Sequence, residues 1–128
     1  MKKQKSQSKS TLRKKADKLF SQACFKKWGS VCTACGREAT ATHHFFPKSG
    51  SAYLRYNLLN GVPLCYGCHI IKIHTQGDPE TLEIIKQSRG QDWYDNLKAL
   101  KKKGLEAKSL NTITYYKEVI KTLQDYIN

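Results

Sequence analysis

Four of the five cysteines in this chain fall into two pairs, each with two residues between its cysteines. The pairs are Cys32-Thr-Ala-Cys35 and Cys65-Tyr-Gly-Cys68. Two intervening residues let both thiolates of a tight turn reach one tetrahedral ion, and two such turns fill its four positions. A site closed by four thiolates has no position for a reactant, so we expect a structural Zn²⁺ that holds a small domain together. The fifth cysteine, Cys24, is expected to be a small core residue.

The charge of the chain is strongly unbalanced. Of its 128 residues, 23 are lysine or arginine and 10 are aspartate or glutamate, which gives a formal net charge of +13. This imbalance predicts a polyanionic partner. Nucleic acid is the first candidate, because neutralised phosphates release counterions, and an anionic membrane surface is the second. The alternative is a basic surface that only keeps the protein soluble.

The sequence contains no apolar run of the ~20 residues needed to span a bilayer. Residues 1–18 are basic, and no apolar segment of the signal-peptide type follows them. We therefore expect a cytoplasmic protein that is not secreted and has no membrane partner. Thiols stay reduced in that compartment, which favours metal binding over disulfides for the cysteine pairs.

The length suits one domain, which the sequence divides into four segments. Residues 1–9 are polar and basic and are expected to form a disordered arm. Residues 10–28 have an apolar stripe at helical spacing among lysines, which predicts a basic amphipathic helix. Residues 29–76 hold all four histidines and four cysteines and are expected to form a compact core of short strands and loops ending in a helix. Residues 77–128 are expected to be a helical extension of the same domain.

Local signals refine the outer helices. Ser10 or Thr11 is the expected N-cap of the first helix. In the last segment, Gly77-Asp78-Pro79 breaks the chain, and two short helices are expected around Gly90. Gly104 ends that region, and a final amphipathic helix is marked by Ile113, Tyr116, Val119, Ile120, Leu123 and Ile127.

The stretch between the two cysteine pairs is longer than a simple zinc site needs. It has 29 residues, against the ~15–20 common in four-cysteine sites. It contains His43-His44, and His69 and His74 follow the second pair. Adjacent residues on a strand point to opposite faces, so His43 and His44 can do different jobs. A neutral histidine can take a proton from water at neutral pH, and a divalent ion can stabilise charge on a phosphate.

Written in order, these residues read C-x2-C, H-H, N-x3-L-C-x2-C-H, H. Over about residues 32–74 this pattern resembles the HNH (ββα-metal) endonuclease family. The resemblance implies an α+β fold, a small zinc-stapled ββα-metal core flanked by N- and C-terminal α-helices. It implies that His44 is the general base and that His43 and His69 bind a catalytic divalent ion (Mg²⁺, Mn²⁺ or Zn²⁺). Asn60 would brace the ββ hairpin and orient the base.

Several assignments stay open at this point. Asn57 is a rival to Asn60, which has a second interpretation as a turn former before Gly61. His74 lies five residues after His69, so it can be a third ligand of the catalytic ion only if the helix is distorted or ends early. Otherwise it is a surface or phosphate-contacting histidine. Three basic residues are candidate DNA phosphate contacts or plain surface: Lys48, Arg55 and Lys72.

The whole chain is also similar to the phage NinG/Rap recombination nucleases. The similar segments are a lysine-rich first helix with Ala16-Asp17-Lys18-Leu19-Phe20-Ser21, the first cysteine pair, Leu54 to Asn57, Asn60 to Cys68 and a lysine-rich helical tail. That family has Gly-His and Cys-Asn where this chain has His-His and Cys-His, which moves this chain toward general HNH nucleases.

This second resemblance implies a bacteriophage enzyme of DNA recombination that cuts branched DNA in the host cell cytoplasm. The sequence therefore predicts a metal-dependent endodeoxyribonuclease acting on double-stranded or branched DNA. A homodimer is expected if both strands are cut. The alternative is a non-catalytic zinc-ribbon module that binds DNA.

Overall fold

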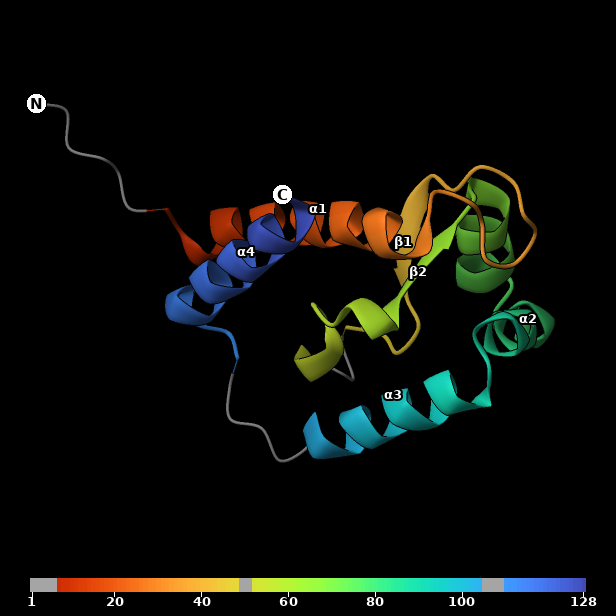
Figure 1. Cartoon of the computed structure of the whole chain (residues 1–128). Helices are drawn as coiled ribbons and strands as arrows, with labels where there is room; N and C mark the ends of the chain where they lie inside the picture. The colour runs from red at the N-terminus through yellow and green to blue at the C-terminus, as the bar shows by residue number, and fades with distance from the viewer. Residues whose placement is uncertain (1–6, 49–51, 105–109) are drawn as a thin grey trace, which may run out of the picture.

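The computed structural model describes residues 7–48, 52–104 and 110–128. The fold is α+β, with helices around a small antiparallel sheet (Figure 1). Two short 3₁₀ turns, η1 (Ala52–Leu54) and η2 (Leu58–Asn60), lead into the second strand. The other elements in chain order are α1 (Lys9–Trp28), β1 (Ala41–His44), β2 (Gly61–Leu64), the π-helix η3 (Gly67–Thr75), α2 (Pro79–Arg89), α3 (Gln91–Gly104) and α4 (Ile113–Ile127).

The N-cap of α1 is Ser8, so the prediction of Ser10 or Thr11 was wrong. The Ser8 hydroxyl accepts a hydrogen bond from the backbone N–H of Thr11 at 3.2 Å. Ser10 and Thr11 therefore lie within the first turn. The helix begins at Lys9, inside the segment expected to be a disordered arm, and residues 1–6 of that segment lie outside the described residues.

The two strands pair antiparallel, with His43 opposite Val62 and His44 opposite Gly61. Val62 and Leu64 are fully buried in the main core cluster, which includes Trp93 of α3. The other side of β2 lies against α1. There the missing side chain of Gly61 leaves room for a buried residue of the helix, because a Cβ at this position would overlap the Sγ of Cys24.

The outer helices follow the expected pattern. Asp78 caps α2, and Gly90, with φ +94°, separates α2 from α3. Helix α4 lies beside α1 (Figure 1), and buried residues of both helices form one apolar cluster: Leu12, Ala16, Tyr116 and Ile120. Ile113 differs from the expectation, because it lies in the first turn of α4 and is 43 % exposed.

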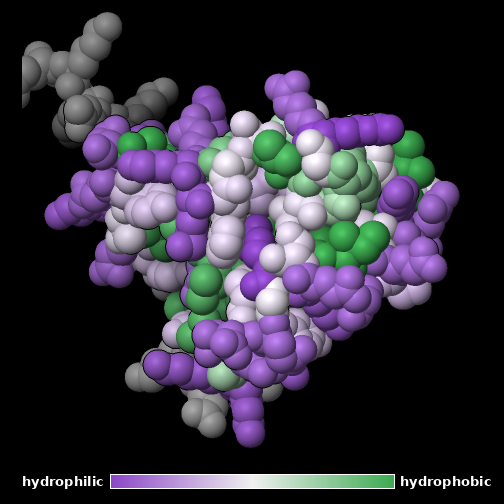
Figure 2. Space-filling model, turned by 45° about the vertical axis from the view of Figure 1, so that its right-hand side comes forward, coloured by the Kyte–Doolittle hydropathy of each residue, from purple (hydrophilic) through white to green (hydrophobic). Residues whose placement is uncertain are grey.

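Hydrophilic side chains cover much of the face shown in Figure 2, and hydrophobic residues appear there only in small separate areas. Among the described helices, none has the length and apolarity required to cross a membrane.

Candidate metal centres and the histidine site

The four sulfur atoms of the cysteine pairs converge, each lying within 4.8 Å of the others. The Sγ atoms of Cys35 and Cys65 are 3.6 Å apart. Thiolates about 2.3 Å from a tetrahedral Zn²⁺ lie about 3.8 Å from one another, so this spacing fits zinc. The first turn closes through Gly36, whose φ is +80° and whose N–H donates to the carbonyl of Cys32 at 2.9 Å. The backbone N–H of Cys68 donates to the Cys65 sulfur at 3.4 Å.

The environment of the thiols is consistent with a cation among them. Burial is the largest influence at Cys68 and raises the pKa of its thiol. Burial also opposes ionisation of Cys32, but hydrogen bonds from nearby backbone groups outweigh it and lower the pKa of that thiol to about 7. Three of these cysteines are buried and Cys35 is exposed. Four thiolates held this close together require a positive charge, which a bound metal ion would supply.

Three of the four histidines form a second cluster. The nitrogen ligand atoms of His43, His69 and His74 lie within 4.8 Å of one another. The ring centroid of His43 is 5.2 Å from that of His69 and 5.6 Å from that of His74. The Nε2 atoms of His69 and His74 are 3.0 Å apart. Nitrogen ligands about 2.0–2.1 Å from a tetrahedral ion lie about 3.3 Å apart, so this triad could hold a metal ion.

The π-helix explains how His74 reaches the triad. Hydrogen bonds in η3 span five residues, for example from the N–H of Gln76 to the carbonyl of Ile71 at 3.0 Å. A helix with this wide turn brings positions five apart onto one face, whereas an α-helix does so for positions three and four apart. The distortion that the sequence required for His74 to join His69 is therefore present.

The triad is chemically suited to hold a cation. His43 is buried, and this burial, followed by the repulsion of His69, His74 and His44, lowers the pKa of its imidazole to about 3. Burial and then His74 lower the pKa of His69. Both rings are therefore neutral at physiological pH, and each keeps an unprotonated nitrogen for a metal.

His44 lies apart from the triad. Its ring stacks on Phe20 of α1, with centroids 5.0 Å apart and planes 16° apart. Its Nε2 lies 2.9 Å from the carbonyl oxygen of Arg55. A carbonyl only accepts, so Nε2 carries the proton and donates, and Nδ1 keeps the lone pair. Burial is the largest influence on His44 and lowers the pKa of its imidazole, against the opposing effect of this hydrogen bond.

The structure separates the two candidate asparagines. Asn60 is fully buried, and its Oδ1 accepts from the N–H of Phe46 at 2.8 Å. Its Nδ2 donates to the carbonyls of Phe46 at 3.0 Å and Leu54 at 3.3 Å. Asn60 thus ties the end of β1 to the segment before β2. Asn57 instead caps η2, because its Oδ1 accepts from the N–H of Leu59 at 2.9 Å.

The three basic candidates differ in their surroundings. Arg55 donates from Nε and Nη2 to both carboxylate oxygens of Asp17, at 3.0 and 2.7 Å, so its guanidinium is already engaged. Lys48 and Lys72 are exposed. The sequence analysis did not predict that Asp17 pairs with Arg55. One signal was available, because Asp17 is the sole acidic residue in the sequence of α1.

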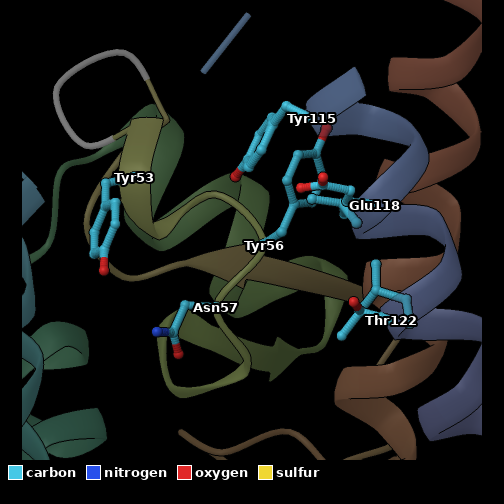
Figure 3. Close-up of a pocket in the computed structure, with 8 residues that line it drawn as sticks. Tyr53, Tyr56, Asn57, Tyr115, Glu118 and Thr122 are labelled. Carbon is cyan, nitrogen blue, oxygen red and sulfur yellow. The ribbon is translucent and has the colours of Figure 1, made fainter. Parts of the chain in front are cut away.

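A groove of about 340 Å³ lies between the segment 52–57 and α4 (Figure 3). Tyr53, Tyr56 and Tyr115 are among the residues that line it, and none of the histidines does. It borders the histidine site through Tyr56, which meets Phe20 edge-on at a centroid distance of 6.1 Å.

Comparisons of the chain with protein-family models, with curated proteins and with solved structures found no match. The chemistry of this chain must therefore be inferred from its own side chains.

Proposed function

We propose that this chain is a metal-dependent endonuclease of the HNH (ββα-metal) type that hydrolyses DNA phosphodiester bonds. The observation that carries the proposal is the convergence of His43, His69 and His74, next in sequence to a fourth histidine whose tautomer is fixed. The triad joins strand β1 to helix η3, and the same helix carries Cys68 of the four-thiol cluster at its start. This order of elements is the one that the HNH resemblance implies.

The residues supply the groups that hydrolysis requires. Nδ1 of His44 accepts a proton from water while the water oxygen bonds to phosphorus, and the bond from phosphorus to the 3′-oxygen breaks. The leaving oxygen takes a proton from solvent. A divalent ion held by the triad would stabilise charge on the phosphate and on this leaving oxygen. Asn60 holds the end of β1 through Phe46, two residues beyond His44, and so helps to fix the strand that carries the base.

The charge of the chain supports DNA as the substrate. The net charge of +13 favours a phosphate backbone, and α1 contributes seven lysine and arginine residues to this balance. The NinG/Rap resemblance extends the proposal to branched DNA in phage recombination. A single centre of this kind cuts one strand, so cleavage of both strands would require two copies of the chain.

One observation favours a second candidate, a zinc-ribbon module that binds DNA without cutting it. The His44 ring is packed against Phe20, on the side of β1 that faces α1, and it makes no ring contact with the triad among the described residues. A histidine in this position could serve packing alone. The module accounts for the charge and the cysteines, but it leaves the convergence of three histidine side chains without a role.

Plasmid nicking distinguishes the two candidates. Wild-type protein should convert supercoiled DNA to the nicked form with Mg²⁺, Mn²⁺ or Zn²⁺, and His44→Ala should lower the rate by about 10²–10⁴-fold, the usual contribution of a general base. Tyr126→Ala is the matched control, because it removes an exposed ring from α4 and should cut normally. Equal binding by wild type and His44→Ala with no cleavage over all three metals would establish the module instead. Labelled RNA and four-way DNA in the same assay define the substrate.

A further inference from the structure

We infer that Asp17 of α1 is a positioning residue for His44 and that it acts through Arg55. The inference rests on the proposed function, because it concerns the orientation of the proposed general base. It adds an acidic residue outside the metal clusters to the machinery of the site.

Two consecutive links join Asp17 to His44. The carboxylate of Asp17 accepts hydrogen bonds from both Nε and Nη2 of Arg55, at 3.0 and 2.7 Å. The backbone carbonyl of Arg55 then accepts the Nε2–H of His44 at 2.9 Å. The paired side chains are partly buried, with 22 % of Arg55 and 35 % of Asp17 exposed. Bidentate pairing fixes direction as well as distance, so it restrains the residue that supplies the carbonyl.

The same helix also fixes the His44 ring. Phe20, which stacks on that ring, lies three residues after Asp17 and therefore on the same face of α1. The next residue is Ser21, and its hydroxyl is 3.1 Å from the hydroxyl of Thr42 on β1. Helix α1 thus contacts the His44 ring through Phe20 and the strand β1 through Ser21. Through Asp17 it also contacts Arg55, whose carbonyl accepts the hydrogen bond of His44. Loss of the Asp17 link would free the acceptor while leaving the ring in place.

The backbone around Arg55 shows why this link matters. Arg55 follows the short turn η1, and its N–H donates to the carbonyl of Ala52 at 3.1 Å. The carbonyl of Leu54 accepts hydrogen bonds from the N–H of Asn57 and from the side-chain amide of Asn60, and these two bonds fix Leu54. The carbonyl of Arg55 lies outside any helix or strand, and its partner among the described residues is His44. Its direction is therefore set by this turn together with the anchor that Asp17 gives to the Arg55 side chain.

The placement of Asp17 is unusual for an ordinary surface charge. Its own helix offers Arg13 and Lys14 one turn away, the spacing at which helical ion pairs form. Its ion pair, however, is made with Arg55, which is 38 residues distant. The pairing also means that Arg55 orients the base through its backbone rather than serving as a free phosphate contact.

The direct test is an NMR measurement of the His44 Nε2–H in zinc-loaded protein labelled with ¹⁵N-histidine. In wild type this proton should be protected from solvent exchange and visible, and His44→Gln assigns the signal by removing it. Asp17→Ala should abolish or broaden the signal, and Asp17→Glu should restore it. Asp125→Ala is the control, since it removes an equal charge from an exposed position on α4 and should leave the signal unchanged.

Cleavage kinetics form the second measurement. Asp17→Ala should lower kcat by about tenfold, a part of the contribution of a general base, with KM changed less than twofold. Asp17→Glu should recover most of kcat. A His44 signal that persists in Asp17→Ala, or an unchanged kcat, would overturn the inference. If no variant cuts DNA while the signal still depends on Asp17, the link stands and the proposed nuclease activity falls.

Discussion

Substitution of Gly61 by alanine tests how tightly α1 packs on β2. The added Cβ would overlap the Sγ of Cys24 and would lie 3.1 Å from Cζ of Phe20 and 3.2 Å from Cγ2 of Thr42. Cys24 and Phe20 are buried, so neither can move into solvent. The φ of Gly61 is −89°, which any residue adopts, so backbone strain does not contribute. The expected effect is therefore one of overpacking alone.

The size of the effect follows from these contacts. Overpacking of a filled core costs about 1–3 kcal/mol, and overlap with a buried sulfur places Gly61→Ala near the upper end. In a domain of this size each kcal/mol lowers Tm by about 4 °C, so the loss should be about 10 °C. Cys24→Ala alone should cost about 1 kcal/mol by removing the buried sulfur. Together the two substitutions should cost less than their sum by about 1–2 kcal/mol, because the second removes the overlap.

Urea and thermal unfolding followed by circular dichroism measure these differences. Gly67→Ala is the matched control: a Cβ there meets no atom within 4 Å, and Gly67 lies in η3 without a positive φ. It should leave stability unchanged or raise it by up to about 1 kcal/mol. If Gly61→Ala melts within 2 °C of wild type, roughly half the shift of a 1 kcal/mol loss, then α1 does not lie on β2 as described. Strictly additive effects with Cys24→Ala would refute the same packing.

Three further outcomes are expected. Cys65→Ser should lose bound zinc and most of its helical signal, because a structural zinc contributes about 10–16 kcal/mol, as much as the whole stability of a small domain; a folded, zinc-free Cys65→Ser would contradict this. His74→Ala should bind one Zn²⁺ fewer per chain by mass spectrometry while keeping its fold, and unchanged stoichiometry would remove His74 from the triad. DNA affinity should fall by about 10³ between 50 and 200 mM salt if about six phosphates are neutralised, and a flat response would argue against backbone binding.

Spacing along the chain was sufficient to predict the four-thiol cluster. Its geometry is local to two short turns, so Cys32, Cys35, Cys65 and Cys68 could be grouped from sequence. Gly36 has the positive φ that such a turn favours, whereas Gly67 sits at the start of a helix and needs none. The helices after Gly77 were also predictable from their apolar periodicity.

The histidine site could be predicted only in part. Which of Asn57 and Asn60 would be buried depends on how the segment 52–60 folds back on β1, and this is a tertiary property. The pairing of Asp17 with Arg55 joins residues far apart in sequence, and no periodicity within α1 indicates it. The Ser8 cap was missed because Ser8, Ser10 and Thr11 lie close together in the sequence, and each could cap the helix.

The wide turn of η3 affects how sites with paired histidines can be found in other sequences. One extra residue inserted between two ligands of an α-helix normally rotates the second ligand away by about 100°, which would destroy the site. A turn closed over five residues absorbs the insertion and keeps His69 and His74 side by side. Deleting Ile71 should therefore restore an ordinary helical turn with the same ligands four apart. Motif searches that require a fixed four-residue interval would pass over chains in which, as here, the two histidines are five residues apart.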